Sequence, residues 1–186
     1  MNNPDIAFRP ARAEDLPILA VWLARPHWRE WWGAPEDELS MIRDMIEGRD
    51  PAEPYLIEMD GEPVGYIQSC RVADILDSGL GEDHPWLSSL PPEAVGIDLS
   101  LADGETLGRG LGSAALTLFL DHLYAQGHRI IVIDPAADNH RAIGAYRKAG
   151  FVAVPRVKDC PNDIHIMVHG PSNHHLIPTD NKTRLA

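Results

Sequence analysis

The chain has 186 residues, 44% of them hydrophobic, and a formal net charge of −12 at pH 7. This length and composition are typical of a globular protein with one domain, and the acidic balance argues against nucleic acid, whose partners are basic. The N-terminal segment lacks the pattern of a signal peptide and no apolar run reaches membrane-spanning length, so we expect a cytoplasmic protein without membrane contacts.

The first half of the chain predicts a strand, two helices and a hairpin. Apolar residues at helical spacing and turn residues at the segment ends indicate the boundaries. In chain order, we expect a strand at 6–11, a helix at 13–24, a loop or short helix at 25–33, a helix at 35–48, a hairpin at 54–71 turning at Asp60 and Gly61, and a long loop at 73–92.

The second half predicts a strand–helix–strand–helix unit. Residues 93–102 alternate strictly, with Val95, Ile97, Leu99 and Leu101 on one face and Asp98 on the other. The remaining segments are expected to be a helix at 112–126, a buried strand at 130–135, a helix at 138–150, two closing strands at 151–157 and 163–170, and a tail without periodicity at 171–186.

A glycine-rich stretch, "LGRGLGS" at 107–113, lies between the strand at 93–102 and the helix that follows. A helix N-terminus presents unpaired N–H groups, and glycines allow the backbone to approach an anion closely, so the stretch is suited to a phosphate. The alternative is a turn without a ligand. The flanking strand and helix favour the phosphate-binding interpretation.

Several segments, taken in order, resemble the GNAT superfamily of acetyl-CoA-dependent N-acetyltransferases, and within it the aminoglycoside 6'-N-acetyltransferases. The matching pieces cover most of residues 6–169. They are "HWREWWG" (27–33), "GEPVGYIQS" (61–69), "GIDLSLA" (96–102), "LGRGLGS" (107–113), "IDP" (133–135) and "NHRAIGAYRKAGF" (139–151).

The resemblance implies a GNAT fold, of the α/β (α+β) class. The expected architecture is a central mixed sheet of six to seven strands, flanked by about four helices, with a splayed pair of parallel strands at the acetyl-CoA site. A single acetyltransferase domain is expected over residues 1–170, followed by the tail at 171–186. The protein is expected to be a monomer or a homodimer.

The resemblance also implies acetyl-CoA as co-substrate. Residues of the glycine-rich stretch, of the preceding strand and of the last helix would bind it: Leu99, Leu101, Leu107, Gly108, Arg109, Gly110, Leu111, Gly112, Ser113, Asn139, Ala142 and Tyr146. Superfamily members usually carry Gln or Arg where this chain has Leu107. That difference matters little if backbone N–H groups bind the phosphates. Asn139 alternatively acts as an ordinary helix cap.

Two residues are the catalytic candidates. In the resembling enzymes, the residue that matches Asp98 is the proposed base, and the residue that matches Tyr146 is the proposed proton donor to the departing thiolate. The alternatives are a solvent-facing Asp98 and a Tyr146 that only packs against Phe151. No cysteine lies beside these candidates in the sequence, which favours direct transfer over an acyl-enzyme.

The expected substrate is a cationic amine, in the first place an aminoglycoside. Aromatic rings suit sugars and cations, and carboxylates suit ammonium groups. The candidate substrate-binding residues are Trp31, Trp32, Gln68, Asp83, Asp98 and Asp134. The acidic residues of the 73–92 loop would form a flap over the substrate, or are merely solvated: Asp74, Asp77, Glu82 and Asp83.

Other functions stay open on the sequence. One is an acetyltransferase for another amine, such as a siderophore hydroxylysine precursor or a polyamine. Another is a domain that binds coenzyme A without turnover, which Asp98 and Tyr146 together argue against. The histidines and the two cysteines do not form a convincing metal set, so no metal is expected.

Overall fold

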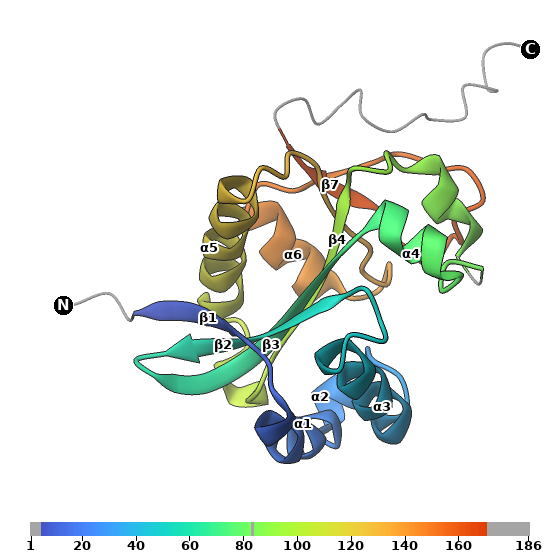
Figure 1. Ribbon diagram of the computed structural model, residues 1–186. Coiled ribbons are helices and arrows are strands. Elements are labelled where there is room, and N and C mark those ends of the chain that lie inside the picture. The colour runs from blue at the N-terminus through green and yellow to red at the C-terminus, as the bar shows by residue number, and fades with distance from the viewer. Residues whose placement is uncertain (1–4, 83, 171–186) are drawn as a thin grey trace, which may run out of the picture. The chain divides into compact units, whose positions relative to one another are not determined.

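The structure is a computed structural model that describes residues 5–82 and 84–170 (Figure 1). Within these residues, seven strands form one sheet in the order β1-β2-β3-β4-β5-β7-β6. The pair β4–β5 is parallel, whereas β1–β2, β2–β3, β5–β7 and β6–β7 are antiparallel. The predicted mixed sheet with one parallel pair is therefore confirmed.

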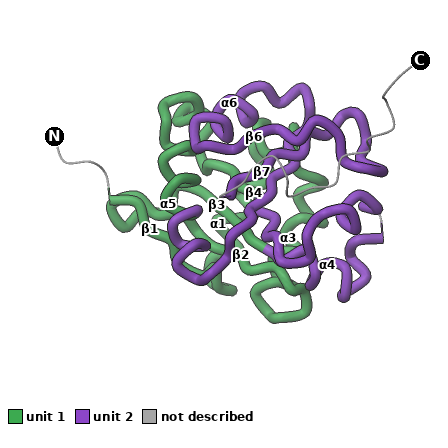
Figure 2. The backbone as a smooth tube through the Cα atoms, turned by 90° about the horizontal axis from the view of Figure 1, so that it is seen from above, with its two compact units in different colours: residues 1–69, 98–119 green, residues 70–97, 120–186 purple. Residues whose placement is uncertain are grey.

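The chain divides into two compact units (Figure 2). Unit 1 comprises residues 1–69 and 98–119, and unit 2 comprises residues 70–97 and 120–186. Strands β3 and β4 and helix α5 continue from one unit into the other. The division of the protein into a domain at 1–170 and a tail stays a prediction, and the tail lies outside the described residues.

Most elements of unit 1 follow the predicted order. They are β1 (Ile6–Pro10), the 3-10 helix η1 (Ala13–Asp15), α1 (Leu16–Leu23), α2 (Pro26–Arg29), α3 (Pro35–Ile46), β2 (Glu53–Met59) and β3 (Glu62–Arg71). The predicted helix at 13–24 thus starts as a 3-10 turn. The buried carboxylate of Asp15 holds this turn in place, because it accepts the N–H of Arg12 at 2.8 Å and pairs with Arg9 at 2.7 Å.

An aromatic and aliphatic cluster forms the core that α1, α2 and α3 share with β2 and β3. Its buried members are Leu19, Trp22, Leu23, Trp28, Ile42, Leu56, Tyr66 and Ala102. The indole N–H of Trp28, which would be costly to bury unpaired, donates to the carbonyl of Leu101 at 2.9 Å. This bond ties the short helix α2 to the end of the strand that carries Asp98.

Strand β4 (Val95–Leu101) leads through η3 (Gly104–Thr106) and the glycine-rich stretch into α5 (Leu111–Ala125). The predicted alternation is largely confirmed, since Val95, Ile97 and Leu101 are buried and Asp98 is exposed. The recorded pairing of β4 with β5 joins Val95 to Ile131 and Gly96 to Val132 and goes no further. Asp98 therefore lies beyond the part of β4 that pairs with β5, as a splayed strand pair requires.

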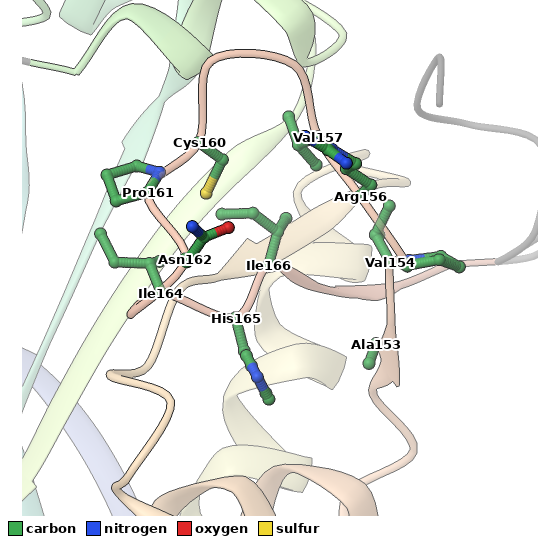
Figure 3. Close-up of a pocket in the computed structure, with 11 residues that line it drawn as sticks. Ala153, Val154, Arg156, Val157, Cys160, Pro161, Asn162, Ile164, His165 and Ile166 are labelled. Atoms are coloured by element: carbon green, nitrogen blue, oxygen red, sulfur yellow. The ribbon is translucent and has the colours of Figure 1, made fainter. Parts of the chain in front are cut away.

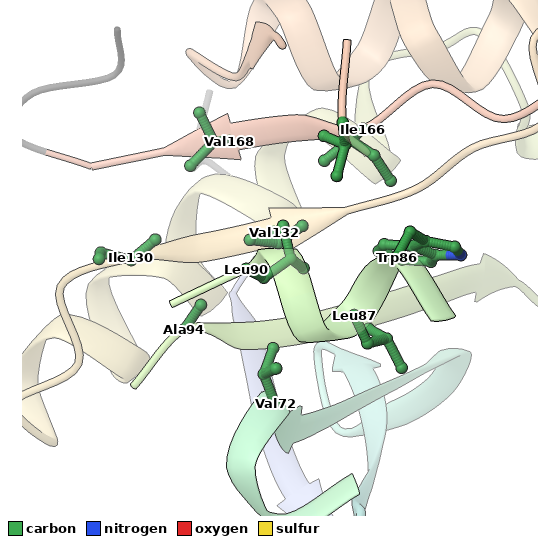
Figure 4. Packing of buried hydrophobic residues seen from close by; sticks show 10 residues of the cluster. Val72, Trp86, Leu87, Leu90, Ala94, Ile130, Val132, Ile166 and Val168 are labelled. Carbon is green, nitrogen blue, oxygen red and sulfur yellow. The ribbon is translucent and has the colours of Figure 1, made fainter. Parts of the chain in front are cut away.

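Unit 2 corrects the prediction of a long loop at 73–92. That segment contains α4 (Val72–Ser78) and the 3-10 helix η2 (Pro85–Ser89). Residues of both segments are buried in a hydrophobic cluster with β5 and β7, and Figure 4 shows Val72, Trp86, Leu87 and Val132 within it. The two short helical elements of this segment are therefore stabilised by burial of their apolar side chains against other strands and loops. Local periodicity in the sequence does not reveal such distant contacts.

The rest of unit 2 consists of β5 (Ile131–Ile133), α6 (His140–Lys148), β6 (Val152–Ala153) and β7 (Met167–His169). The two closing strands are much shorter than predicted. Between them, residues 154–166 form a loop that contains Pro155 and Pro161, which lack the N–H that strand pairing needs. The described residues contain six α-helices rather than about four, because α2 and α4 are additional short helices.

Candidate functional site

Asp98 lies on β4 beside Gln68 of β3. The amide nitrogen Nε2 of Gln68 donates to Oδ2 of Asp98 at 3.1 Å. Asp98 is exposed as a residue, yet protein atoms surround its carboxyl group and remove much of its water. This desolvation raises the pKa of Asp98 above its ordinary value, and the hydrogen bond from Gln68 partly opposes the increase.

A second carboxylate, that of Glu38, belongs to the same neighbourhood. Glu38 is in the first turn of α3, and its Oε1 accepts the N–H of Gly33 at 2.8 Å. Burial raises the pKa of Glu38, the bond from Gly33 lowers it, and the negative charge of Asp98 raises it further. Two partly desolvated carboxylates make this region attractive to a cation.

The adjacent tryptophans Trp31 and Trp32 differ in their surroundings. Trp32 packs into the core of unit 1, with its ring centroid 5.1 Å from that of Trp28 and 5.8 Å from that of Tyr66. Trp31 is half-buried, and its indole Nε1 is buried without a hydrogen-bond partner among the residues described here. A buried N–H without a partner is unusual in a native structure, and it leaves the hydrogen-bonding capacity of the indole unmet.

The glycine-rich stretch adopts backbone conformations that favour glycine. Gly108 and Gly110 have φ values of 77° and 94°. The bond from the N–H of Ala114 to the carbonyl of Gly110, at 3.0 Å, starts the ladder of α5. The N–H groups of the first turn before Ala114 have no acceptor within the helix and are free for an anion.

The stretch lies against the end of β4. A β-carbon added to Gly112 would be 3.8 Å from Cδ1 of Leu101. Arg109 is exposed and forms no ion pair with any described residue, so its guanidinium can reach a phosphate. Unit 1 thus places the predicted phosphate-binding residues and Asp98 on consecutive parts of one strand, loop and helix.

The carbonyl of Leu101 is already engaged within unit 1. It accepts the N–H of Trp28 and also a bond from His27 Nε2 at 3.0 Å. Leu99 and Leu101 are the two β4 residues predicted to bind acetyl-CoA. Because the carbonyl of Leu101 is occupied, the backbone of Leu99 is the better candidate. The sequence analysis did not predict that His27 and Trp28 bond this end of β4.

In unit 2, α6 carries three of the predicted cofactor residues. Asn139, Ala142 and Tyr146 are spaced by three and four positions, which places them along one side of the helix. Asn139 is the helix cap, because its side-chain oxygen accepts the N–H of Ala142 at 3.1 Å. Tyr146 is buried and its ring lies 6.1 Å from that of Phe151. The packing alternatives for both residues are thus present in the structure, and their roles toward acetyl-CoA stay predictions.

Asp134 directly follows β5 and is half-buried. Desolvation raises the pKa of the Cys160 thiol, and the negative charges of Asp134 and Asp163 raise it further. Cys160 lines a cavity of about 390 Å³ formed by the 153–166 segment. Figure 3 shows Cys160, Asn162 and Ile166 within the arch of this segment and His165 pointing away from it. The raised pKa keeps Cys160 protonated and argues against a role as nucleophile.

The predicted acidic flap is partly helical. Asp74 is in α4 and lies 3.9 Å from Arg71, and Glu82 is exposed in the following turn, while Asp83 lies outside the described residues. The described part of the chain contains no cluster of three or more metal-ligating side chains. Across those same residues, no helix has the length and apolarity needed to span a membrane.

Two residues of the Asp98 neighbourhood were not predicted, namely Glu38 and Tyr66. The hydroxyl of Tyr66 donates to Oε1 of Gln68 at 2.8 Å. Strand alternation contained a signal for Tyr66, because it stands two residues before Gln68 and shares its face of β3. Nothing local to the sequence indicates Glu38, which the packing of α3 brings toward Asp98.

Comparison with known proteins identifies the family of this chain. Residues 11–158 match the acetyltransferase (GNAT) domain. The chain is 35% identical over 157 residues to the aminoglycoside N(6')-acetyltransferase type 1 of Klebsiella pneumoniae, an alignment that covers 81% of this chain and 75% of the relative.

Solved structures agree with this result. The aminoglycoside acetyltransferase AAC(6')-Ib in complex with coenzyme A superposes with a TM-score of 0.76 at 31% identity, covering 90% of this chain and 95% of the other. Its complex with coenzyme A and kanamycin superposes with a TM-score of 0.74 at 30% identity, again covering 90% and 95%.

Proposed function

The chain belongs to the GNAT family of acetyltransferases, and we propose that it moves an acetyl group from acetyl-CoA to an amine of an aminoglycoside, the 6'-amine in the first place. Aminoglycosides are polycationic amino sugars, and acetylation of an amine removes one of their positive charges. The expected consequence in a cell is antibiotic resistance.

The observation that carries this proposal is the carboxylate and aromatic neighbourhood of Asp98 in unit 1. Asp98 and Glu38 supply negative charge, and Trp31 keeps a buried N–H without a protein acceptor. An amino sugar offers ammonium groups to these carboxylates. The identity of about one third to aminoglycoside acetyltransferases supports the same substrate class.

Binding of acetyl-CoA is assigned to the glycine-rich stretch. The first N–H groups of α5 and the guanidinium of Arg109 would hold the pyrophosphate, while the backbone of Leu99 would bond the pantetheine arm. The residues of α6 keep their predicted role toward acetyl-CoA, namely Asn139, Ala142 and Tyr146. Binding of both reactants by one enzyme would remove much of the entropic cost of a bimolecular step.

Proton removal from the amine is assigned to Asp98. The substrate amine is an ammonium at neutral pH and must lose one proton before its lone pair can attack the thioester carbon. The partial desolvation of Asp98 raises its pKa and makes it a stronger base than an exposed aspartate, directly or through a water. The predicted roles toward the substrate are kept as part of the proposal for Trp31, Trp32, Gln68, Asp134 and Asp83.

The attack forms a C–N bond and places negative charge on the carbonyl oxygen, which the N–H of Leu99 would stabilise. Collapse of this intermediate breaks the C–S bond and releases the thiolate of coenzyme A. Tyr146 would donate its phenolic proton to that thiolate, and the acylated nitrogen, which is positively charged after the attack, loses its second proton through solvent and so restores the phenol. The net products are the N-acetylated amine and coenzyme A, with no acyl-enzyme.

The test replaces Asp98 by Asn, which is nearly isosteric and cannot take a proton. Activity is measured as thiol release from acetyl-CoA with a panel of aminoglycosides, a polyamine and hydroxylysine. We expect kcat to fall by roughly 100- to 10,000-fold while the Kd of acetyl-CoA stays the same, because other residues bind it. The matched control is Asp44→Asn, which removes an exposed carboxylate of α3 that pairs with Arg49.

The outcomes separate the alternatives. Turnover restricted to the polyamine or to hydroxylysine would replace the substrate class, and binding of acetyl-CoA without turnover of any amine would favour a sensor domain. An Asp98→Asn enzyme with native kcat and KM would remove Asp98 from the site. A raised KM with unchanged kcat would reduce Asp98 to a binding residue.

A further inference from the structure

A chain of two hydrogen bonds leads from the core of unit 1 to the Asp98 carboxylate. The hydroxyl of Tyr66 donates to Oε1 of Gln68 at 2.8 Å, and Nε2 of Gln68 donates to Oδ2 of Asp98 at 3.1 Å. Tyr66 and Gln68 are two residues apart on β3, so their side chains leave the same face of the strand. The three groups thus form one connected network.

The chemistry of the groups determines the direction of this network. An ionised carboxylate only accepts hydrogen bonds, so the amide must face Asp98 with its NH₂ group. Its oxygen then faces Tyr66, where it needs a donor, and the phenolic O–H is that donor. If Asp98 were protonated on Oδ2, its O–H would favour the reversed amide, which could no longer accept from Tyr66. The arrangement therefore matches the ionised form of Asp98, the form that takes a proton.

Tyr66 is a rigid starting point for this network. Its side chain is fully buried, and its ring centroid lies 6.3 Å from that of Trp28 and 5.8 Å from that of Trp32. The hydroxyl also lies 3.6 Å from Sδ of Met45, but a hydroxyl has one proton and a thioether is a weak acceptor. The proton therefore goes to Gln68.

We propose that Tyr66 is a positioning residue which, through the Gln68 amide, holds the Asp98 carboxylate oriented and ionised for proton transfer. Gln68 thereby takes a role toward the base rather than only toward the substrate. The inference rests on the proposed function in one respect, the role of Asp98 as the base. It requires no particular amine.

The charges around the network agree with it. Burial raises the pKa of Tyr66 well above its ordinary value, and the charges of Asp98, Glu38 and Asp50 raise it further, so the phenol remains a donor throughout the working pH range. The pKa of Asp98 is raised by desolvation, and only the bond from Gln68 lowers it. Loss of that bond leaves desolvation unopposed, so the Asp98 pKa must rise further.

The experiment measures the titration of Asp98 by ¹³C NMR of carboxyl-labelled protein without substrate, with the signal assigned by its absence in Asp98→Asn. Tyr66→Phe keeps the ring and removes the donor, and Gln68→Met removes the amide. A hydrogen bond to a charged group corresponds to a shift of roughly one to two pKa units. We expect an increase of that size in Gln68→Met and an increase of about one unit in Tyr66→Phe.

The matched control is Tyr55→Phe, which removes another phenol of unit 1, bonded to Glu53 at 2.7 Å on β2. It should leave the Asp98 titration unchanged. Thermal unfolding checks that each variant folds. Gln68 is only half-buried, so Gln68→Met tests the network even if Tyr66→Phe loses stability. An unchanged Asp98 titration in Tyr66→Phe would mean that Tyr66 only packs, and would overturn the proposal.

Enzyme kinetics give the second readout. The acid limb of kcat/KM should move to higher pH in Tyr66→Phe and Gln68→Met by the same amount as the Asp98 titration, while the KM for acetyl-CoA stays constant. A lower kcat with no shift of the limb would also contradict the positioning role. Because the NMR titration needs no amine, a wrong substrate class would leave the test of Tyr66 intact.

Discussion

At the scale of single residues, the two proposed proton-transfer groups differ in their surroundings. Asp98 is reached by solvent and is linked to Gln68, whereas Tyr146 is buried and packs near Phe151. A base at an accessible position can pass its proton to water after each turnover. The phenol of Tyr146 has one O–H group that it can donate. Both environments suit the roles assigned to them.

Replacement of Tyr146 by Phe tests the proton donor. The ring and its packing remain, so we expect native stability and a native Kd for acetyl-CoA. General acid assistance is worth roughly 100- to 10,000-fold, so kcat should fall within that range. The measurement is steady-state kinetics with acetyl-CoA and with an acetyl thioester of a more acidic thiol. The second thiolate needs less protonation, so the loss in kcat should be smaller with it. An equal loss with both donors would contradict the assignment.

At the scale of elements, the junction between β4 and α5 concentrates the predicted co-substrate residues. Gly108 and Gly110 have positive φ values, and Gly112 lies close to Leu101 of β4. The end of β4 is itself held by Trp28 and His27, which bond the carbonyl of Leu101. The glycines therefore allow the backbone conformation of the loop, and α2 holds the end of β4 from which the loop starts.

Gly110→Ala tests this junction. A β-carbon at a φ of 94° costs roughly 1–2 kcal/mol of strain, which the loop would relieve by moving. We expect weaker acetyl-CoA binding, measured by calorimetry. Gly48→Ala is the matched control, because Gly48 follows the end of α3 with a φ of 72° and, like Gly110, has no heavy atom within 4 Å of the added carbon. The control should lose similar stability but keep the native Kd. Equal Kd values for both variants would remove the loop from the co-substrate site.

At the scale of the whole molecule, the relevant properties are the net charge and the extent of the folded domain along the chain. The net charge of −12 favours the approach of a polycation, and this attraction weakens as salt screens it. The GNAT match ends at residue 158, and the last described strand ends at His169. The segment at 171–186 follows both and shows no apolar periodicity in its sequence.

A chain that ends at Gly170 tests the extent of the domain. Because the 171–186 segment has no apolar pattern to bury, its removal should leave the free energy of unfolding and the kcat/KM for the amine nearly unchanged. Thermal unfolding and thiol-release kinetics on the truncated and full chains check this. Large losses in both quantities would show that the segment belongs to the fold or to an interface between copies.

The sequence by itself determined the order of the elements and the family. Strict alternation at 95–101 identified β4 and the exposure of Asp98, the glycines at 108 and 110 indicated the turn before α5, and the spaced motifs indicated the GNAT fold. These features are local, because backbone conformation and strand alternation depend on neighbours in the chain. Aspects that depend on distant residues were predicted less well, as at 73–92, where burial against other segments creates α4 and η2.

Only the tertiary structure decided which side chains surround Asp98. Glu38 reaches its neighbourhood from α3, and Tyr66 reaches it through Gln68 on β3, at sequence separations of 60 and 32 residues that no periodic pattern spans. Hydrogen bonds and desolvation act over a few ångströms, so the pKa of a carboxylate depends on spatial neighbours rather than on chain neighbours. The sequence could therefore identify Asp98 as the candidate base, whereas packing determined how strong a base it is.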